Sequence, residues 1–189
     1  MATARRAIGG CGLQTAALAA GGYAGVSLAG VANTEEYDGT SWGPGGNLNT
    51  ARLGSTAFGI QTVAVAAGGY VSTASVTNVE EYNGSAWTAV TALPAARNGL
   101  GSAGTQTAGL AFGGITSGGP VTNATEEFVS GAFPFAAWSR GGNLGTARRT
   151  LAGAGTQTAG LAFGGVSGGP NLNATEEYDG SAWTGGGNL

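Results

Sequence analysis

The sequence predicts an all-β fold made of four copies of one unit, and three observations support that prediction. A double glycine recurs along the 189-residue chain at spacings of 47, 45 and 51 residues. Each copy holds four short stretches of strand character between turn signals, and no stretch has an apolar period long enough for a helix. Four-stranded antiparallel units of about 45 residues that cannot bury both faces alone are typical of a β-propeller. We therefore predict one domain with blades over residues 3–49, 50–94, 95–145 and 146–189.

Four landmarks align the copies. In order, they are an arginine, a Gln-Thr pair, the double glycine, and a Glu-Glu-aromatic triplet followed by tryptophan. We expect each arginine to meet a glutamate of a triplet, and each tryptophan to pack against its own hairpin and a neighbouring blade. Because these positions recur in every copy, we interpret them as structural. The arginines are Arg5, Arg52, Arg97 and Arg148, and the tryptophans are Trp42, Trp87, Trp138 and Trp183.

The second copy illustrates the expected elements in chain order. Residues 52–59 are predicted as the first strand, residues 62–67 as the second and residues 79–82 as the third. The second strand is apolar or small on both faces, which is expected of a strand covered on both sides. The double glycine ends it, because glycine tolerates positive φ where the chain turns sharply.

An Asn-Gly or Asp-Gly dipeptide follows the third strand in three copies. Between two strand-like runs this dipeptide predicts a two-residue type I′ hairpin turn. In the last copy such a turn over Asp179-Gly180 pairs Tyr178 with Ser181 and places the Tyr178 and Trp183 side chains diagonally on one face. The third copy departs from the pattern, with an insertion carrying Phe133-Pro134-Phe135 that lengthens this hairpin by five residues.

The landmarks together resemble the Kelch repeat. That repeat has an arginine after a Leu-Pro-like linker, a glycine-containing first strand, a double glycine after the second strand, and an aromatic residue followed by tryptophan in the last two strands. All four copies show the landmarks, although Kelch rings usually have more than four blades. The resemblance implies a galactose-oxidase-like propeller without catalytic residues, since that enzyme's copper site uses histidines and this chain has none. The phrases GTQTAGLAFGG and ATEEYDGSAW are also similar to repeat arrays in structural proteins of marine bacteriophages, which implies a virion component.

Composition and charge exclude several classes of partner. The chain has seven basic and ten acidic residues and a net charge of −3, and its arginines are scattered among the copies. A nucleic-acid partner would need a basic stripe, so none is expected. No uninterrupted run approaches the roughly 18 apolar residues of a membrane span, so we expect a soluble protein without a membrane partner.

The absence of histidine also restricts the chemistry. With no histidine and a single cysteine, Cys11, no catalytic triad, Cys-His pair or two-histidine metal site can form. We expect no enzyme activity, metal or cofactor. The glycine run at residues 99–104 has GxGxxG spacing but leads into a hairpin rather than a helix, so it is not a dinucleotide site. The alternative is a hydrolase or lyase that uses carboxylates alone at the propeller axis. A glutamate that lines a pocket without an arginine or backbone partner would favour that alternative.

Residues that break the repeat are the better candidates for function, because the fold does not require them. The loops between the second and third strands differ most among the copies, and they lie on one face with the linkers that enter each blade. Variable loops on a rigid scaffold are where binding functions occur. We expect this loop face to bind a protein or a glycan. The candidate contacts are Arg6, Asn98, Arg149, Tyr23 and Tyr70.

Ring closure is the last expectation from the sequence. The chain begins with a first strand and finishes after a fourth, so no blade is shared between the termini and closure depends on face packing. Glycine, alanine and serine fill the first strands, whereas tyrosine and tryptophan are kept for the outer ones. This gradient favours a closed four-bladed monomer. The alternative is a homodimer in which two chains join head to tail into an eight-bladed ring.

Overall fold

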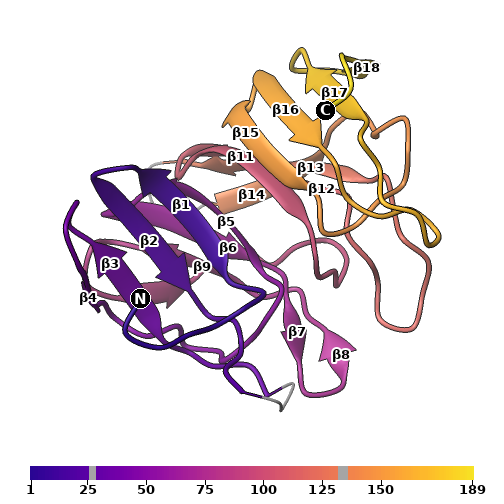
Figure 1. Ribbon diagram of the computed structural model, residues 1–189. Coiled ribbons are helices and arrows are strands. Elements are labelled where there is room, and N and C mark those ends of the chain that lie inside the picture. Colours follow the sequence, from indigo (N-terminus) through magenta and orange to yellow (C-terminus); the bar gives the residue numbers. More distant parts are fainter. Residues whose placement is uncertain (26–28, 132–135) are drawn as a thin grey trace.

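The computed structural model describes residues 1–25, 29–131 and 136–189. These residues form four four-stranded antiparallel sheets in a propeller arrangement, together with a small two-stranded sheet (Figure 1). The predicted all-β fold with four blades is therefore confirmed. Within the described ranges, no helix is long and apolar enough to cross a membrane.

Each blade is a meander in which consecutive strands of the repeat are hydrogen-bonded neighbours. The small hairpin of β7 and β8 lies in the loop between the second and third strands of the second blade. The first blade holds β1 (Gly9–Leu13), β2 (Ala16–Ala20), β3 (Thr34–Tyr37) and β4 (Trp42–Pro44), and the second holds β5 (Thr56–Ile60), β6 (Val63–Ala67), β7 (Tyr70–Val71), β8 (Ala74–Ser75), β9 (Val79–Tyr82) and β10 (Trp87–Ala89). The third holds β11 (Gly101–Thr105), β12 (Ala108–Phe112), β13 (Thr125–Ser130) and β14 (Ala136–Arg140), and the fourth holds β15 (Ala152–Thr156), β16 (Ala159–Phe163), β17 (Thr175–Tyr178) and β18 (Trp183–Gly185).

The strands of the second blade differ slightly from those predicted. The third strand, β9, matches residues 79–82, but the first strand begins at Thr56 rather than at residue 52. The residues before Thr56 make other contacts instead of pairing with β6. The Arg52 side chain is buried, and Leu53 forms a bridge with Tyr70. The first strand also runs on to Ile60, one residue past the predicted end, and Gly59 lies inside it with a φ of 108°, a conformation that favours glycine.

The last hairpin turns one residue later than predicted in three of the blades. In the fourth blade the Asp179 N–H donates to the Ala182 carbonyl at 3.1 Å, so the turn centres on Gly180-Ser181. Gly180 has a φ of 96°, which suits the first central position of a type II′ turn. The Asp179 carboxylate accepts hydrogen bonds from the N–H groups of Ser181 and Ala182, each at 2.8 Å, and so holds this placement. The predicted type I′ turn is wrong.

The later turn changes which residues pair across the hairpin, but the same side chains still lie on each face of it. Tyr178 pairs directly with Trp183 instead of with Ser181. The shift moves each partner by two residues, and because side chains alternate along a strand, the same residues still share a face. The two rings lie 4.9 Å apart between centroids, so the expected aromatic pair forms by direct rather than diagonal contact.

The third blade keeps this pairing despite its longer hairpin. Phe128 of β13 pairs with Trp138 of β14, and both strands extend further than their equivalents. The inserted residues Phe133, Pro134 and Phe135 lie outside the described residues. The insertion therefore leaves the aromatic slot of the blade unchanged.

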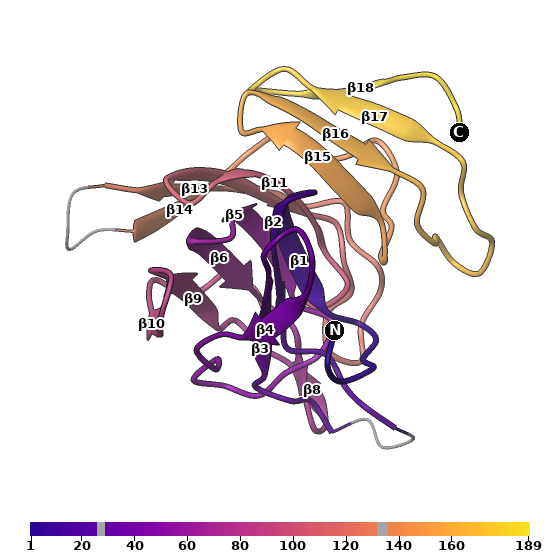
Figure 2. The same ribbon diagram turned by 60° about the vertical axis from the view of Figure 1, so that its left-hand side comes forward.

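The hydrophobic core is divided among the contacts between neighbouring blades. Three clusters of buried residues each combine side chains from two consecutive blades. Stability is thus shared along the arc of blades rather than concentrated in one centre, as expected of a repeat architecture (Figure 2). Residues that meet across the three clusters are Leu18 and Trp87, Phe58 and Phe128, and Phe112 and Trp183.

Backbone groups close to the axis join one blade to the next. The Gly54 N–H donates to the Ala7 carbonyl at 2.7 Å, the Gly99 N–H to the Gly54 carbonyl at 2.8 Å, and the Thr150 N–H to the Gly99 carbonyl at 2.7 Å. All four residues have positive φ, between 52° and 64°. This line of hydrogen bonds passes once through every blade and fixes the spacing of their inner ends.

Closure of the ring within one chain is not observed. The inner strands pack in chain order, β1 on β5, β5 on β11 and β11 on β15. Among the described residues, no contact of comparable extent joins β15 to β1, and the first and fourth blades lie at opposite ends of the arc (Figure 1). One face of each end blade is consequently left without a neighbouring blade.

Candidate functional site

The repeated arginines form buried ion pairs with the first glutamate of each triplet. Arg148 lies 3.0 Å from Glu176 and also donates to the carbonyls of Gly164, which follows β16, and Ala174, which precedes β17. Each arginine therefore ties two neighbouring strands of its own blade together, as the sequence predicted. Removing one partner of a buried pair typically costs about 3–5 kcal/mol, which explains why the pair recurs. The other pairs are Arg5 with Glu35 at 2.7 Å, Arg97 with Glu126 at 3.6 Å, and Arg52 with Glu80.

In the wider pair of the third blade, burial shifts the pKa values of both partners. Burial raises the pKa of Glu126, and the attraction of Arg97 only partly offsets it. Burial likewise lowers the pKa of Arg97. In the first blade burial would also raise the pKa of Glu35, but hydrogen bonds from Ala2 and Arg5 lower it overall. The long Arg97–Glu126 contact thus only partly offsets the burial of its two charged groups.

In the first and third blades, the second glutamate of the triplet faces the next blade and accepts a hydrogen bond from a tyrosine there. The Tyr82 hydroxyl donates to Glu36 at 2.5 Å, and the Tyr178 hydroxyl donates to Glu127 at 2.6 Å. Burial, followed by the Glu127 hydrogen bond, raises the pKa of Tyr178 to about 12. These bonds cross from one blade to the preceding one and lock the two faces together.

The contact between the second and third blades lacks this bond. Phe128 occupies the tyrosine position there, and Oε1 of Glu81 is buried without a hydrogen-bond partner. The linker residue opposite has changed as well. Gly45 and Gly141 precede the two tyrosine-bearing blades, and an added Cβ would lie 3.0 Å and 2.6 Å from the tyrosine hydroxyls. At this contact the equivalent residue is Val90, which fills the space that a hydroxyl would need.

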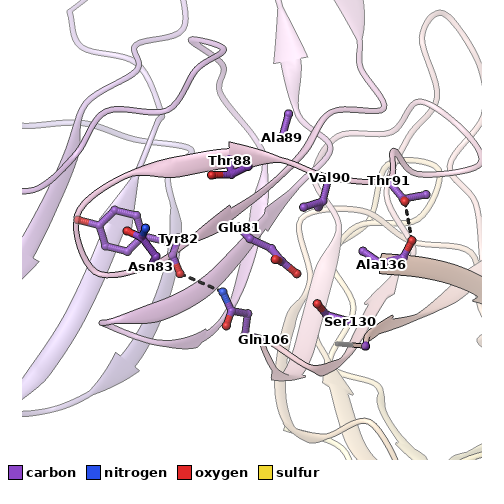
Figure 3. A pocket seen from close by; sticks show the side chains of 11 residues that line it. Glu81, Tyr82, Asn83, Thr88, Ala89, Val90, Thr91, Gln106, Ser130 and Ala136 are labelled. Atoms are coloured by element: carbon purple, nitrogen blue, oxygen red, sulfur yellow. Dashed lines mark hydrogen bonds between the residues drawn. The ribbon is translucent and has the colours of Figure 1, made fainter. Parts of the chain in front are cut away.

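Glu81 lines a pocket of about 540 Å³ between the second and third blades (Figure 3). Val90 and Thr91 form one side of it, and Gln106 and Ser130 lie opposite. The Gln106 amide donates to the Tyr82 carbonyl at 2.9 Å. Glu81 is the one acidic residue among the described lining residues. The sequence had not singled out Glu81 as a site residue. The signal for it was the change to valine at the end of the second copy together with the change to phenylalanine in the third.

On the loop face, Arg6 and Tyr23 are brought into contact. The Arg6 guanidinium carbon lies 4.5 Å from the centre of the Tyr23 ring, and the two backbones form a bridge. Arg6 is exposed, and both residues line an open hollow of about 420 Å³. Stacking on an aromatic ring holds the guanidinium flat while its edge remains available for hydrogen bonds.

The other predicted contacts occupy equivalent places in the remaining blades. Tyr70 pairs with Ser75 in the β7–β8 hairpin, and the Asn98 side chain donates to the Ser75 hydroxyl at 2.8 Å. These two residues are therefore joined through Ser75 and partly used by the fold. Arg149 is exposed beside its bridge to Val166. The structure thus groups Arg6 with Tyr23 and Asn98 with Tyr70, and places Arg149 in the fourth blade.

The propeller axis holds a hollow of about 310 Å³ lined by the inner ends of all four blades. Its lining residues are small or apolar, among them Gly9, Ser55, Gly101 and Gly153, and none of them is acidic or basic. Close packing explains these residues, since a Cβ on Gly153 would lie 2.4 Å from the Ser102 carbonyl oxygen. In the described part of the chain, no cluster of histidine, cysteine, aspartate or glutamate could hold a metal ion.

Comparison with known proteins supports the fold. The solved structure of YjhT is similar, with a TM-score of 0.80 over 98% of this chain and 71% of that one, at 11% sequence identity. At this identity the similarity shows the propeller architecture alone. No family model and no curated protein sequence matches the chain.

Proposed function

We propose that this chain is a non-enzymatic propeller of the Kelch type that binds an anionic group of a protein or glycan through its loop face. The proposal rests on the stacked Arg6–Tyr23 pair. A guanidinium held on an aromatic ring is preorganised to meet a carboxylate, sulfate or phosphate with two parallel hydrogen bonds. Arg149 offers a second exposed guanidinium on the same face. A place in a virion agrees with the similarity of the repeats to phage structural arrays.

The alternative is a hydrolase or lyase with carboxylates at the axis. Glu81 lines a pocket with Oε1 unpaired, which is the observation that would favour it, but this pocket lies between two blades and not at the axis. Glycoside hydrolysis ordinarily requires two carboxyl groups across the scissile bond. The axial hollow offers none, and the pocket between the second and third blades offers Glu81 alone among its described lining residues. One unpaired carboxylate can accept hydrogen bonds from a ligand but lacks the second acid or base. A binding role therefore accounts for the residues of both cavities better than catalysis does.

The test compares acidic and neutral ligands on matched variants. Sulfated and uronic-acid oligosaccharides, neutral oligosaccharides of equal length and acidic peptides are titrated against the chain by calorimetry. We expect binding of an acidic probe, weakened at least tenfold by Arg6→Ala or Arg149→Ala. Arg140→Ala is the control, because Arg140 is exposed on β14 and its loss changes the net charge equally. If Arg6→Ala and Arg149→Ala leave the binding of every probe unchanged, the loop face is not the site.

A further inference from the structure

The first and last contacts between blades use one common set of hydrogen bonds. The middle contact keeps the glutamine bond, but Phe128 has no hydroxyl and the Trp138 indole donates to the Thr91 carbonyl instead of to a threonine hydroxyl. The later blade presents a donor face, which carries the glutamine of the Gln-Thr pair, the aromatic residue of the triplet and the tryptophan. The earlier blade presents an acceptor face, which carries the second glutamate, the preceding threonine and backbone carbonyls. At the last contact, Gln157 donates to the Phe128 carbonyl at 2.8 Å and the Trp183 indole to the Thr125 hydroxyl at 2.9 Å. At the first contact, Gln61 donates to the Tyr37 carbonyl at 2.7 Å and Trp87 to Thr34 at 3.0 Å.

The two end blades carry the same groups without a neighbouring blade. The first blade has a complete donor face, with Gln14, Tyr37 and Trp42 in the three slots. Gln14 is exposed, whereas its equivalents in the later blades are half-buried. The fourth blade has a complete acceptor face, with Thr175 and Glu177 in the slots that receive tryptophan and tyrosine elsewhere. Glu177 is exposed, unlike every equivalent glutamate.

The apolar parts of the end faces are complementary as well. Leu189 follows the fourth blade as Leu48, Leu93 and Leu144 follow the others, with the same backbone hydrogen bond. Those three leucines are 1–3% exposed because the next blade covers them, whereas Leu189 is 74% exposed. Phe163 on β16 is likewise only half-buried, while its equivalent Phe112 is fully buried against Trp183 at 4.9 Å between ring centroids.

A glycine at the open end indicates which aromatic residue belongs there. Where the next blade supplies a tyrosine, the linker residue is glycine, and where it supplies Phe128, the linker residue is Val90. The open acceptor face has Gly186 in this position, with its N–H bonded to the Thr175 carbonyl at 2.8 Å as in the other copies. The face is therefore shaped to receive a tyrosine hydroxyl at Glu177. The free donor face offers that group in Tyr37.

The line of backbone bonds near the axis points the same way. It begins with Ala7, whose N–H is unused among the described residues, and finishes at Thr150, whose carbonyl is unused among them. In each observed step, an N–H of the later blade donates to a carbonyl of the earlier one. The step that would follow the fourth blade needs an N–H from a residue placed like Gly54, and Ala7 is that residue in the first blade of a second copy. The free Ala7 N–H and the free Thr150 carbonyl can therefore extend the line from one chain to the next.

We propose that the acceptor face of the fourth blade binds the donor face of the first blade of a second copy of this chain. In this contact Tyr37 donates to Glu177 of the second copy, Gln14 to its Tyr178 carbonyl, and Trp42 to its Thr175 hydroxyl. A second copy is the fitting occupant because it brings both faces with it. Two chains joined twice form the smallest assembly in which all four end faces are covered.

The experiment measures mass by light scattering over a concentration series. The expected result is a species of twice the 18.2 kDa chain mass that dissociates on dilution. Leu189→Asp places a charge in the apolar contact, and Gln14→Glu replaces a donor by an acceptor facing carbonyls. Both residues are exposed in the single chain, so folding is retained, and each change should weaken association at least tenfold.

Ile60→Asp is the matched control. Ile60 is 49% exposed at the tip of β5, away from both end faces, so this variant should associate like the unchanged chain. Larger assemblies that grow with concentration and disappear with Leu189→Asp would also support contact between the end faces. A chain that stays single at every concentration means that something other than a second copy covers these faces, which overturns the proposal. Association that Leu189→Asp and Gln14→Glu leave unchanged overturns it too.

Discussion

Exchanging two residues at the contact between the second and third blades tests the pairing of tyrosine with glycine. Phe128→Tyr alone directs a hydroxyl at the Val90 side chain, and such overpacking costs about 1–3 kcal/mol. Val90→Gly alone removes a half-buried side chain and frees the backbone of the unfolded chain, at a cost of about 1–2 kcal/mol. Together the changes open the space and let the hydroxyl donate to Glu81, whose Oε1 is buried without a partner. A hydrogen bond to a charged group contributes about 1.5–3 kcal/mol.

The expected result is a strong coupling between the two changes. The double variant should be at least about 2 kcal/mol more stable than the sum of the single variants predicts, because the clash disappears and the hydrogen bond forms only in the pair. Urea unfolding followed by tryptophan fluorescence gives the free energies of unfolding.

The reverse exchange at the contact between the third and fourth blades is the matched control. Gly141→Val should be strongly destabilising, since a Cβ there lies 2.6 Å from the Tyr178 hydroxyl, and Tyr178→Phe should recover part of the loss. Free energies that add within about 0.5 kcal/mol in both cycles would refute the reasoning.

Two further predictions concern the aromatic residues. Trp87→Ala should lower the free energy of unfolding by about 3–5 kcal/mol, because Trp87 is buried against its hairpin and the first blade. Trp42→Ala should lower it clearly less in the dilute single chain, because Trp42 is only half-buried there. Equal losses in urea unfolding would contradict this. Alkaline pH should destabilise the fold through Tyr178: its pKa is raised from 10.0 to about 12, so the neutral hydroxyl contributes stability fully below pH 10, and that contribution is lost as the pH rises to 12. Tyr178→Phe should flatten the fall in melting temperature over this range, and an unchanged slope would count against the assignment.

The repeats predicted the architecture because each blade must solve the same packing problem. The recurring arginine and Glu-Glu pair predicted the buried ion pairs, and the tryptophan slot predicted the aromatic pairs. The turn register was not predictable from the Asp-Gly dipeptide, because the dipeptide fits two placements. The Asp179 carboxylate selects the later placement by accepting two backbone N–H groups, which depends on side-chain geometry rather than on propensity.

The candidate sites, too, were only partly predictable from the sequence. Arg6 and Arg149 were identified because they break the repeat, but the stacking of Arg6 on Tyr23 required the backbone bridge between them. Glu81 was missed as a site residue because a glutamate in a repeated slot looks structural. Its difference arises from Val90 in the same copy and Phe128 in the next one, and only the structure shows that all three meet.

The proposed contact between copies would also affect the loop face, which yields a last prediction. A Cβ on Gly99 would lie 3.7 Å from the Arg149 Cβ, so the residue that follows the repeated arginine lies beside the inner loop of the preceding blade. In a head-to-tail contact, Arg6 of one copy would therefore lie near Arg149-Thr150 of the other.

Two guanidinium groups brought together in this way repel each other unless an anion lies between them. An anion that binds both should favour the associated state by mass action. Adding sulfate at constant ionic strength, with chloride as the control, should thus raise the fraction of double-mass species in light scattering. Arg6→Ala should remove the sulfate dependence while leaving association itself in place, because Arg6 is not part of the donor face. If sulfate and chloride act alike on the unchanged chain, the anion site and the contact between copies are independent.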